Sequence, residues 1–282
     1  GLTTPVSAAV AAGLAAPESR GRVLALVFMG ITIAGVLGVP AGSWIAYTYG
    51  WRVAFHLVGG LATAFAVVIW LLVPAGLRFQ PVRLADLRTA LVDGRLMLAI
   101  GFTAIFLGAI YVPYTYLAPL LEERMGLGRN GVTAALVVCG LGAVAGNFAG
   151  GWLSDRLGPF RTLRALTLGQ VAIMPLLSLL PMPLGLAMML FFVWNGVGFA
   201  FNSSQQVRLV ALAGAQAPVA LALNAACIYV GAALGAALGG RVVAGAGLSA
   251  LGVAGGITAL LAVAAILASQ RLTPVDRASP RP

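Results

Sequence analysis

Residues 248–268 read LSALGVAGGITALLAVAAILA, with no charged side chain among them. A helix that crosses a bilayer needs roughly 20 apolar residues, and this segment supplies them. Comparable runs precede it at about 23–47, 53–73, 96–120, 131–153, 163–180, 184–207 and 218–240. Each run must be a helix, because hydrocarbon satisfies no backbone hydrogen bond. The sequence therefore predicts an all-α fold, a polytopic membrane helix bundle.

The composition excludes most other classes of protein. The chain has 282 residues, of which 61% are hydrophobic and only 9% are charged, and its mean hydropathy is +1.01. A soluble domain carries about 25% charged residues, so a chain this poor in charge could not cover its own surface. The two cysteines, Cys139 and Cys227, each lie inside an apolar run and show no metal-binding spacing. We expect neither a metal site nor a bound cofactor.

The net charge of +10 reflects arginines that determine how the chain is oriented in the membrane. All 17 basic residues are arginines, and they flank the apolar runs instead of gathering on one polar face. This distribution is typical of arginines that set the orientation of a protein in the membrane, and not of a nucleic-acid-binding surface. If the hinge at 17–22 is cytoplasmic, 13 arginines face the cytoplasm and 4 face out, namely Arg52, Arg124, Arg129 and Arg241. We expect a multi-pass protein of a bacterial inner (plasma) membrane, with its central linker and C-terminus in the cytoplasm.

The longest polar stretch divides the runs into two sets. We predict that residues 1–73 are the remainder of an N-terminal half, 74–95 a cytoplasmic linker, 96–269 a complete six-helix half and 270–282 a cytoplasmic tail. A weak repeat supports this division, since the tripeptide LAL at 24–26 and again at 221–223 precedes a glycine-rich run. Two parallel six-helix halves are typical of one large transporter class. Residues 1–16 are then the end of a fourth helix, and we expect an N-terminally truncated piece.

The segment Gly150–Arg161, GGWLSDRLGPFR, joins two runs on the predicted cytoplasmic side. Gly151 would allow close packing and Gly158 a tight turn. Asp155 follows a helix and lies beside Arg156, so it could bind an arginine or the positive N-terminus of another helix. The alternative is an ordinary loop that ends a helix.

The segment from Gly151 to Gly158 resembles the loop signature of the major facilitator superfamily, in its second-half copy. Arg161 occupies one of the basic positions that follow, and Pro159 departs from the pattern. The resemblance implies that the aspartate locks a cytoplasmic gate against the start of another helix. The gate residues implied are Gly151, Asp155, Arg156, Gly158, Arg161, Arg20 and Arg22.

Two glycine-rich runs extend the resemblance. Residues 35–42, GVLGVPAG, resemble the fifth-helix signature of exporting antiporters, which implicates Gly35, Gly38, Pro40 and Gly42. A plain helix-packing motif is the alternative. Residues 221–240 resemble the eleventh helix of the drug:proton antiporter-1 (12-span) branch, which includes arabinose-efflux-like and chloramphenicol-resistance-like members. Gly142, Gly146 and Gly150 form a similar glycine face on an earlier run.

Polar side chains inside the runs are candidates for contact with a solute, because a membrane span carries them at some cost. Asn195, Gly198, Asn202 and Gln206 share one helical face. With neighbouring aromatic and amide residues they would suit a neutral or amphipathic solute. The alternative is hydrogen bonding between helices. The candidate solute-binding residues are Tyr111, Tyr114, Trp194, Asn195, Asn202 and Asn224.

The runs contain no aspartate, glutamate or central arginine; all seven acids lie in loops. A proton antiporter needs a titratable group in its pathway. The resemblance implies that this group precedes Gly1. His56 and Gln170 are interpreted as packed, structural residues.

These observations predict a secondary transporter, not an enzyme. The function expected from the resemblance is proton-coupled efflux of a small amphipathic or drug-like solute by alternating access, in a monomer embedded in the lipid bilayer. A sugar or arabinose-type exporter, an importer of the same superfamily, and a non-transporting truncated membrane protein are the alternatives. A membrane-embedded enzyme would need clustered catalytic residues, which a chain with one histidine does not offer.

Overall fold

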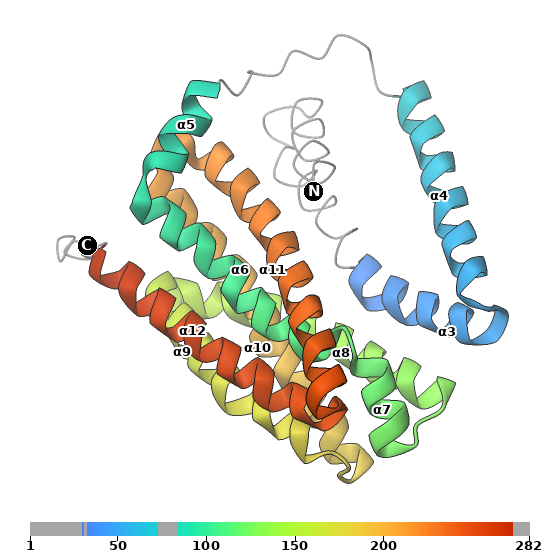
Figure 1. The fold of residues 1–282 in the computed structure, drawn as a ribbon. Helices are drawn as coiled ribbons and strands as arrows, with labels where there is room; N and C mark the ends of the chain where they lie inside the picture. Colours follow the sequence, from blue (N-terminus) through green and yellow to red (C-terminus); the bar gives the residue numbers. More distant parts are fainter. Residues whose placement is uncertain (1–29, 31–32, 73–83, 273–282) are drawn as a thin grey trace. The chain divides into compact units, whose positions relative to one another are not determined.

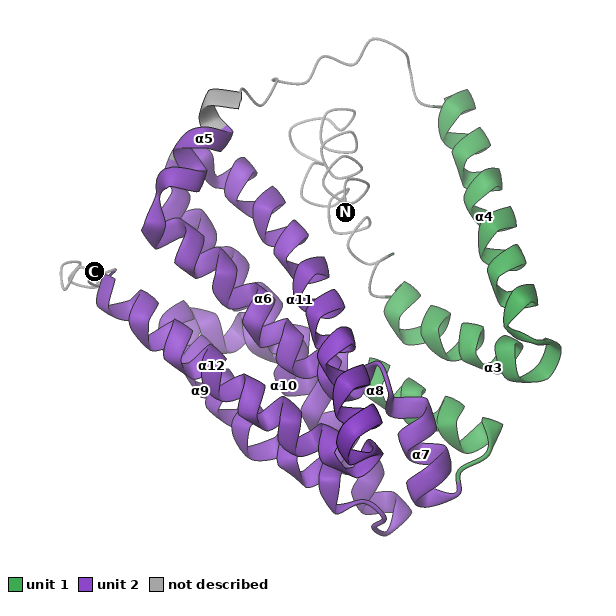
Figure 2. Cartoon of the chain, viewed as in Figure 1, with its two compact units in different colours: residues 1–81, 127–140 green, residues 82–126, 141–282 purple. Residues whose placement is uncertain are grey.

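The computed structural model describes residue 30 and residues 33–72 and 84–272. Throughout these ranges the regular elements are helices, without a strand, as predicted (Figure 1). The chain divides into two compact units (Figure 2). Unit 1 comprises residues 1–81 and 127–140, and unit 2 comprises residues 82–126 and 141–282. Arg20 and Arg22 of the predicted gate lie outside the described residues.

Unit 1 contains a π-helical turn, Ala34–Gly38, followed by α3 (Val39–Tyr49) and α4 (Trp51–Leu72), together with the first part of α8 (Arg129–Leu157). Pro40 lies in the first turn of α3, where its missing N–H costs little. The turn just before Pro40 is a π-helix, which is wound more widely than an α-helix. Gly50, at a φ of 92°, allows the tight turn from α3 into α4.

Unit 2 contains the remaining helices. Three precede α8 in the chain: α5 (Leu84–Val92), α6 (Gly94–Tyr114) and α7 (Leu117–Met125). The others are α9 (Pro159–Ile173) with a 3₁₀ turn at Met174–Leu179, α10 (Leu184–Ala213), α11 (Ala217–Ala246), and α12 (Leu251–Leu272) after a short turn at Leu248–Ala250. Seven stretches of the described residues are long and apolar enough to cross a membrane.

The run predicted at 96–120 is two helices. Pro113 lies in the last turn of α6, and Thr115 and Tyr116 separate α6 from α7. A proline lacks the N–H that an α-helix interior needs and crowds the preceding turn, so the break falls just after it. At its other end α6 is capped by the Asp93 carboxylate, which accepts the backbone N–H groups of Arg95 and Leu96 at 2.9 and 3.2 Å.

The glycine faces predicted from the sequence are helix–helix contacts in unit 2. A Cβ built on Gly231, Gly235 or Gly239 of α11 would lie less than 3.0 Å from a backbone carbonyl oxygen of α6. The same is true of Gly142, Gly146 and Gly150 on α8, which face carbonyls of α10. Small residues allow such close approach in lipid, where larger apolar side chains gain little by leaving the hydrocarbon. These two glycine faces fix how α11 packs on α6 and how α8 packs on α10.

The end of α10 corrects a prediction. The apolar run stops at Val207, and the sequence places Arg208 in a cytoplasmic loop. In the structure α10 continues to Ala213, and the Arg208 side chain is buried, with 1% of its surface exposed. The prediction was wrong because it equated the end of the apolar run with the end of the helix.

Candidate functional site

A cluster of aromatic and amide side chains lies between α6, α9 and α10. We call it the central cluster; it consists of Tyr111, Tyr114, Gln170, Trp194 and Asn195. The rings of Tyr111 and Tyr114 meet edge to face with centroids 5.6 Å apart, and those of Tyr114 and Trp194 are 6.1 Å apart. Trp194 is fully buried, whereas the two tyrosines are half-buried. The structure thus brings together four of the six candidate solute-binding residues.

The central cluster holds polar atoms that make no hydrogen bond. Gln170 donates its amide N–H to the Trp194 carbonyl at 3.3 Å, and Asn195 donates to the Phe191 carbonyl at 3.1 Å. The amide oxygens of both side chains and the indole N–H of Trp194 are buried without a partner among the described residues. An unpaired buried polar group costs about 1–3 kcal/mol. The cluster therefore keeps two acceptors and one donor unpaired among the described residues.

A second polar group lies further along α10, towards its C-terminal end. The Thr103 hydroxyl donates to the Asn224 amide oxygen at 2.6 Å. Gln205 donates its amide N–H to that hydroxyl at 2.9 Å and to the Ala99 carbonyl at 2.7 Å. This network joins α6, α10 and α11, so Asn224 bonds between helices, which is the alternative that the sequence left open for it.

Gln205 was missed by the sequence analysis, which placed its neighbour Gln206 on the polar face. Gln206 is exposed and Gln205 is fully buried, while Asn202 is half-buried. The sequence did contain a sign of the buried face, because residues 194, 198, 201, 205 and 208 follow the spacing of one side of a helix.

The loop segment 151–161, predicted as a loop, is almost entirely helical: residues 151–157 with Asp155 form the last turns of α8, and α9 begins at Pro159, so Gly158 alone separates the two helices. Gly158 has a φ of 80°, a conformation that side chains rarely adopt, which bears out the predicted tight turn, and Pro159 begins α9. Asp155 is exposed, and the Arg156 guanidinium carbon lies 4.3 Å from the centroid of the Trp152 ring. A Cβ on Gly151 would meet nothing within 4 Å among the described residues; the close approach expected there occurs at Gly150.

The antiporter-type motif lies in unit 1. Gly35 and Gly38 belong to the π-helical turn, whereas Pro40 and Gly42 belong to α3. A Cβ on any of these glycines would meet nothing within 4 Å in the described part of the chain. Within the same unit, Arg129 donates to the Thr48 hydroxyl at 3.0 Å and lies 5.5 Å from the Trp44 ring centroid.

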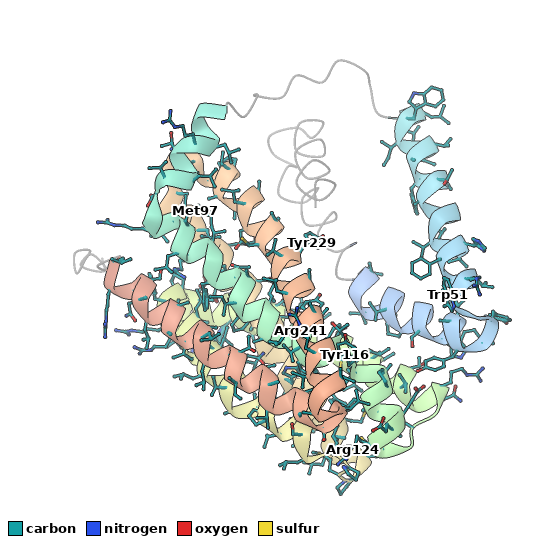
Figure 3. All side chains as sticks on the ribbon, in the orientation of Figure 1. Trp51, Met97, Tyr116, Arg124, Tyr229 and Arg241 are labelled. Carbon is teal, nitrogen blue, oxygen red and sulfur yellow. The ribbon has the colours of Figure 1, made fainter. Side chains whose placement is uncertain are left out.

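Two hydrogen-bonding side chains, Tyr116 and Arg124, lie at the other end of unit 2. Tyr116, which follows α6, donates its hydroxyl to the Ala236 carbonyl of α11 at 3.1 Å (Figure 3). Arg124 of α7 donates twice to the Leu180 carbonyl, at 2.6 and 3.1 Å. The Arg124 bonds hold α7 against the turn that leads into α10.

Sequence comparisons identify relatives that cover nearly the whole chain. A sequence model of the Major Facilitator Superfamily matches residues 1–217. The Inner membrane transport protein YdhP of Escherichia coli (strain K12) is 32% identical over 266 residues, which cover 94% of this chain and 68% of that protein. The Chloramphenicol resistance protein of Streptomyces lividans is 32% identical over 242 residues, covering 82% of this chain and 59% of that one.

A solved structure shares the fold. The crystal structure of a bacterial homolog to the human lysosomal transporter Spinster, in an inward-facing and unoccupied conformation, matches with a TM-score of 0.69. The match covers 99% of this chain and 76% of the other, at 18% sequence identity. At that identity the likeness shows the fold alone.

Apolar helices of membrane length, packed through glycine faces around a buried aromatic and amide cluster, define a polytopic membrane helix bundle. The chain belongs to the major facilitator superfamily. This confirms the resemblance drawn from the loop signature.

Proposed function

We propose that the protein exports a small, uncharged amphipathic solute in exchange for protons, and that the central cluster contacts the solute. The observation that carries the proposal is the set of three unpaired buried polar atoms beside three aromatic rings. A solute with an aromatic ring and with hydroxyl or amide groups could stack on Tyr114 and pair with these atoms. Membership of a transporter superfamily supports the proposal, and so does the name of the chloramphenicol resistance relative.

The arginines of unit 2 support an orientation. The bonds from Gln205 to the Thr103 hydroxyl and from Ser204 to the Gly150 carbonyl place the start of α6 and the ends of α8 and α10 at one end of the unit. That end carries Arg88, Arg95, Arg156, Arg161, Arg164, Arg208 and Arg271, against Arg124 and Arg241 at the other. Because arginine accumulates in cytoplasmic loops, we place this end in the cytoplasm.

The same orientation puts the loop segment 151–161 at the cytoplasmic surface. Asp155 is exposed there and is therefore free to meet a helix of the N-terminal half. We propose that this carboxylate closes the cytoplasmic gate, with Arg20 and Arg22 at the start of its partner helix. The coupling proton would be carried by a residue of the intact protein outside unit 2. The division into 1–73, 74–95, 96–269 and 270–282 belongs to the same proposal.

The test of the solute site is counterflow of labelled chloramphenicol in liposomes, with and without a pH gradient, using protein from the complete reading frame. Trp194→Phe keeps the ring and removes the indole N–H. We expect KM to rise about fivefold, the cost of one hydrogen bond, with kcat retained. Trp70→Phe is the matched control, because Trp70 on α4 is 81% exposed. An unchanged KM in Trp194→Phe would show that the central cluster does not contact the solute. Absence of counterflow in the parent protein would show that chloramphenicol-like solutes are not transported.

The same liposomes test the gate. Asp155→Asn keeps the shape of the side chain and removes its charge, so a contact with an arginine or a helix N-terminus weakens. We expect kcat to change by about fivefold with KM retained. Glu123→Gln, exposed at the opposite end of unit 2, is the control. Equal turnover in both variants would exclude Asp155 from the gate.

A further inference from the structure

Arg208 is the one arginine of unit 2 that is fully enclosed by the described residues. It lies on α10 and reaches three other helices. Its guanidinium carbon is 4.4 Å from the ring centroid of Phe160 on α9 and 5.9 Å from that of Phe102 on α6. It also donates a short hydrogen bond to the Ser269 hydroxyl on α12. One side chain therefore joins four helices at the proposed cytoplasmic end.

This arginine is kept at an energetic cost. In the part of the chain that the structure describes, it has no carboxylate partner, and its Nε and one terminal nitrogen are buried without a hydrogen bond. A buried charge without a counter-ion is destabilising, and an apolar side chain of similar volume is often neutral or better. Ionisable residues inside a membrane bundle are for this reason commonly functional.

The depth of Arg208 explains how the charge is tolerated. It is 24 residues beyond the start of α10 at Leu184, which is about 36 Å at 1.5 Å per residue. The hydrocarbon core is only about 30 Å thick. Arg208 therefore lies near the interface, at the level of the turn between α8 and α9.

The contact with Phe160 connects this charge to the loop segment 151–161. Phe160 is the second residue of α9 and follows Gly158, the glycine that turns the chain out of α8. The neighbouring pair, Arg156 over Trp152 at 4.3 Å, is exposed. A cation–π contact is worth about 0.5–1 kcal/mol when exposed and about 2 kcal/mol when desolvated. Of the two, the Arg208 contact is the one strong enough to fix the loop.

We infer that Arg208 is a positioning residue for the gate: through Phe160 it fixes the first turn of α9 to α6, α10 and α12, and with it the turn at Gly158 that follows Asp155 at the end of α8. The inference rests on the proposed function, because it gives the loop a role in transport. It predicts that the loop loosens without Arg208 while the rest of unit 2 keeps its fold.

Amide hydrogen exchange, measured without any solute on protein from the complete reading frame, tests whether Arg208 positions the first turn of α9. In Arg208→Met and in Phe160→Leu we expect the amides of residues 157–162 to exchange at least about tenfold faster. Arg208→Lys keeps a cation over the ring and should restore most of the protection. The unfolding temperature of Arg208→Met should equal or exceed that of the parent. The control is Arg52→Met in unit 1, which removes an exposed arginine lying 4.5 Å from the Trp51 ring centroid and should change neither quantity.

Counterflow of labelled chloramphenicol supplies the functional readout. We expect Arg208→Met to lower kcat with KM retained, and Arg208→Lys to recover it. Unchanged exchange at 157–162 in Arg208→Met would overturn the inference. Faster exchange across all of unit 2 with a lower unfolding temperature would also overturn it, because Arg208 would then be a general structural residue. Faster exchange at 157–162 without any chloramphenicol counterflow would support the positioning and refute the proposed solute.

Discussion

The two units carry the same glycine pattern with opposite surroundings. In unit 1, Gly38 and Gly42 would accept a Cβ without meeting any described atom within 4 Å. In unit 2, Gly146 and Gly235 have backbone carbonyls where that Cβ would lie. Every residue of α4, the helix that follows, is likewise exposed or nearly so among the described residues, although most of its side chains are apolar. A glycine face therefore indicates that a helix can be approached closely, and a partner must be present before the face contributes to stability.

The largest expected effect concerns Gly146. Gly146→Ala places a methyl group less than 3.0 Å from three backbone atoms of Gly196, and backbone cannot move aside cheaply. We expect the free energy of unfolding to fall by about 3 kcal/mol or more, seen as a lower unfolding temperature in detergent. Gly151→Ala on the same helix meets open space and should gain up to about 1 kcal/mol in helix propensity. Equal unfolding temperatures for the two variants would contradict the packing of α8 on α10.

A pair of substitutions compares the units directly. Gly235→Ala meets the Gly108 carbonyl and the Tyr111 Cβ, both closer than 3.0 Å, and should cost about 2 kcal/mol. Gly38→Ala should cost nothing if α3 keeps its open face in the complete protein. A cost at Gly38 similar to that at Gly235, measured by unfolding of both variants, would show that another segment covers the antiporter-type motif.

The smallest expected effect compares two threonines. Thr103→Val leaves the Asn224 amide oxygen without its donor and removes one acceptor of Gln205, so we expect a loss of about 1 kcal/mol. Thr48→Val removes the exposed acceptor of Arg129 and should stay within about 0.5 kcal/mol. If both variants unfold like the parent, the network around Thr103 contributes no stability.

The sequence predicted the spans well because hydropathy reports where a helix must avoid water. It also predicted the glycine faces of α8 and α11, since spacing at i and i+4 places small residues on one side of a helix. The chain from Gly151 to Gly158 was specific enough to give the family. These are local properties, and each can be read from one segment.

The partners of individual side chains were less predictable, because they depend on how helices rotate against one another. The face through Asn195 and Asn202 was extended to Gln206, yet α10 turns Gln205 inward to Thr103. Asn224 was grouped with the solute contacts, and nothing in the sequence indicated that its amide oxygen accepts a hydrogen bond from Thr103 of α6. Arg208 was assigned to a loop because its charge ends the apolar run, whereas aromatic rings of α6 and α9 enclose it. No single segment contains that information.

The helix α5 bears on where the protein can be divided. Its residue Ala90 is fully buried with Leu96 and Ala99 of α6, Leu209 of α10 and Ala220 of α11, and Leu87 packs against that group. Unit 2 thus includes α5, which lies inside the predicted linker 74–95 and packs on α6, α10 and α11. If the gene were split at Gly94, the second fragment would lack α5, and the apolar surface that Ala90 and Leu87 cover would be exposed. If it were split before Leu84, the second fragment would contain α5 and this surface would stay covered.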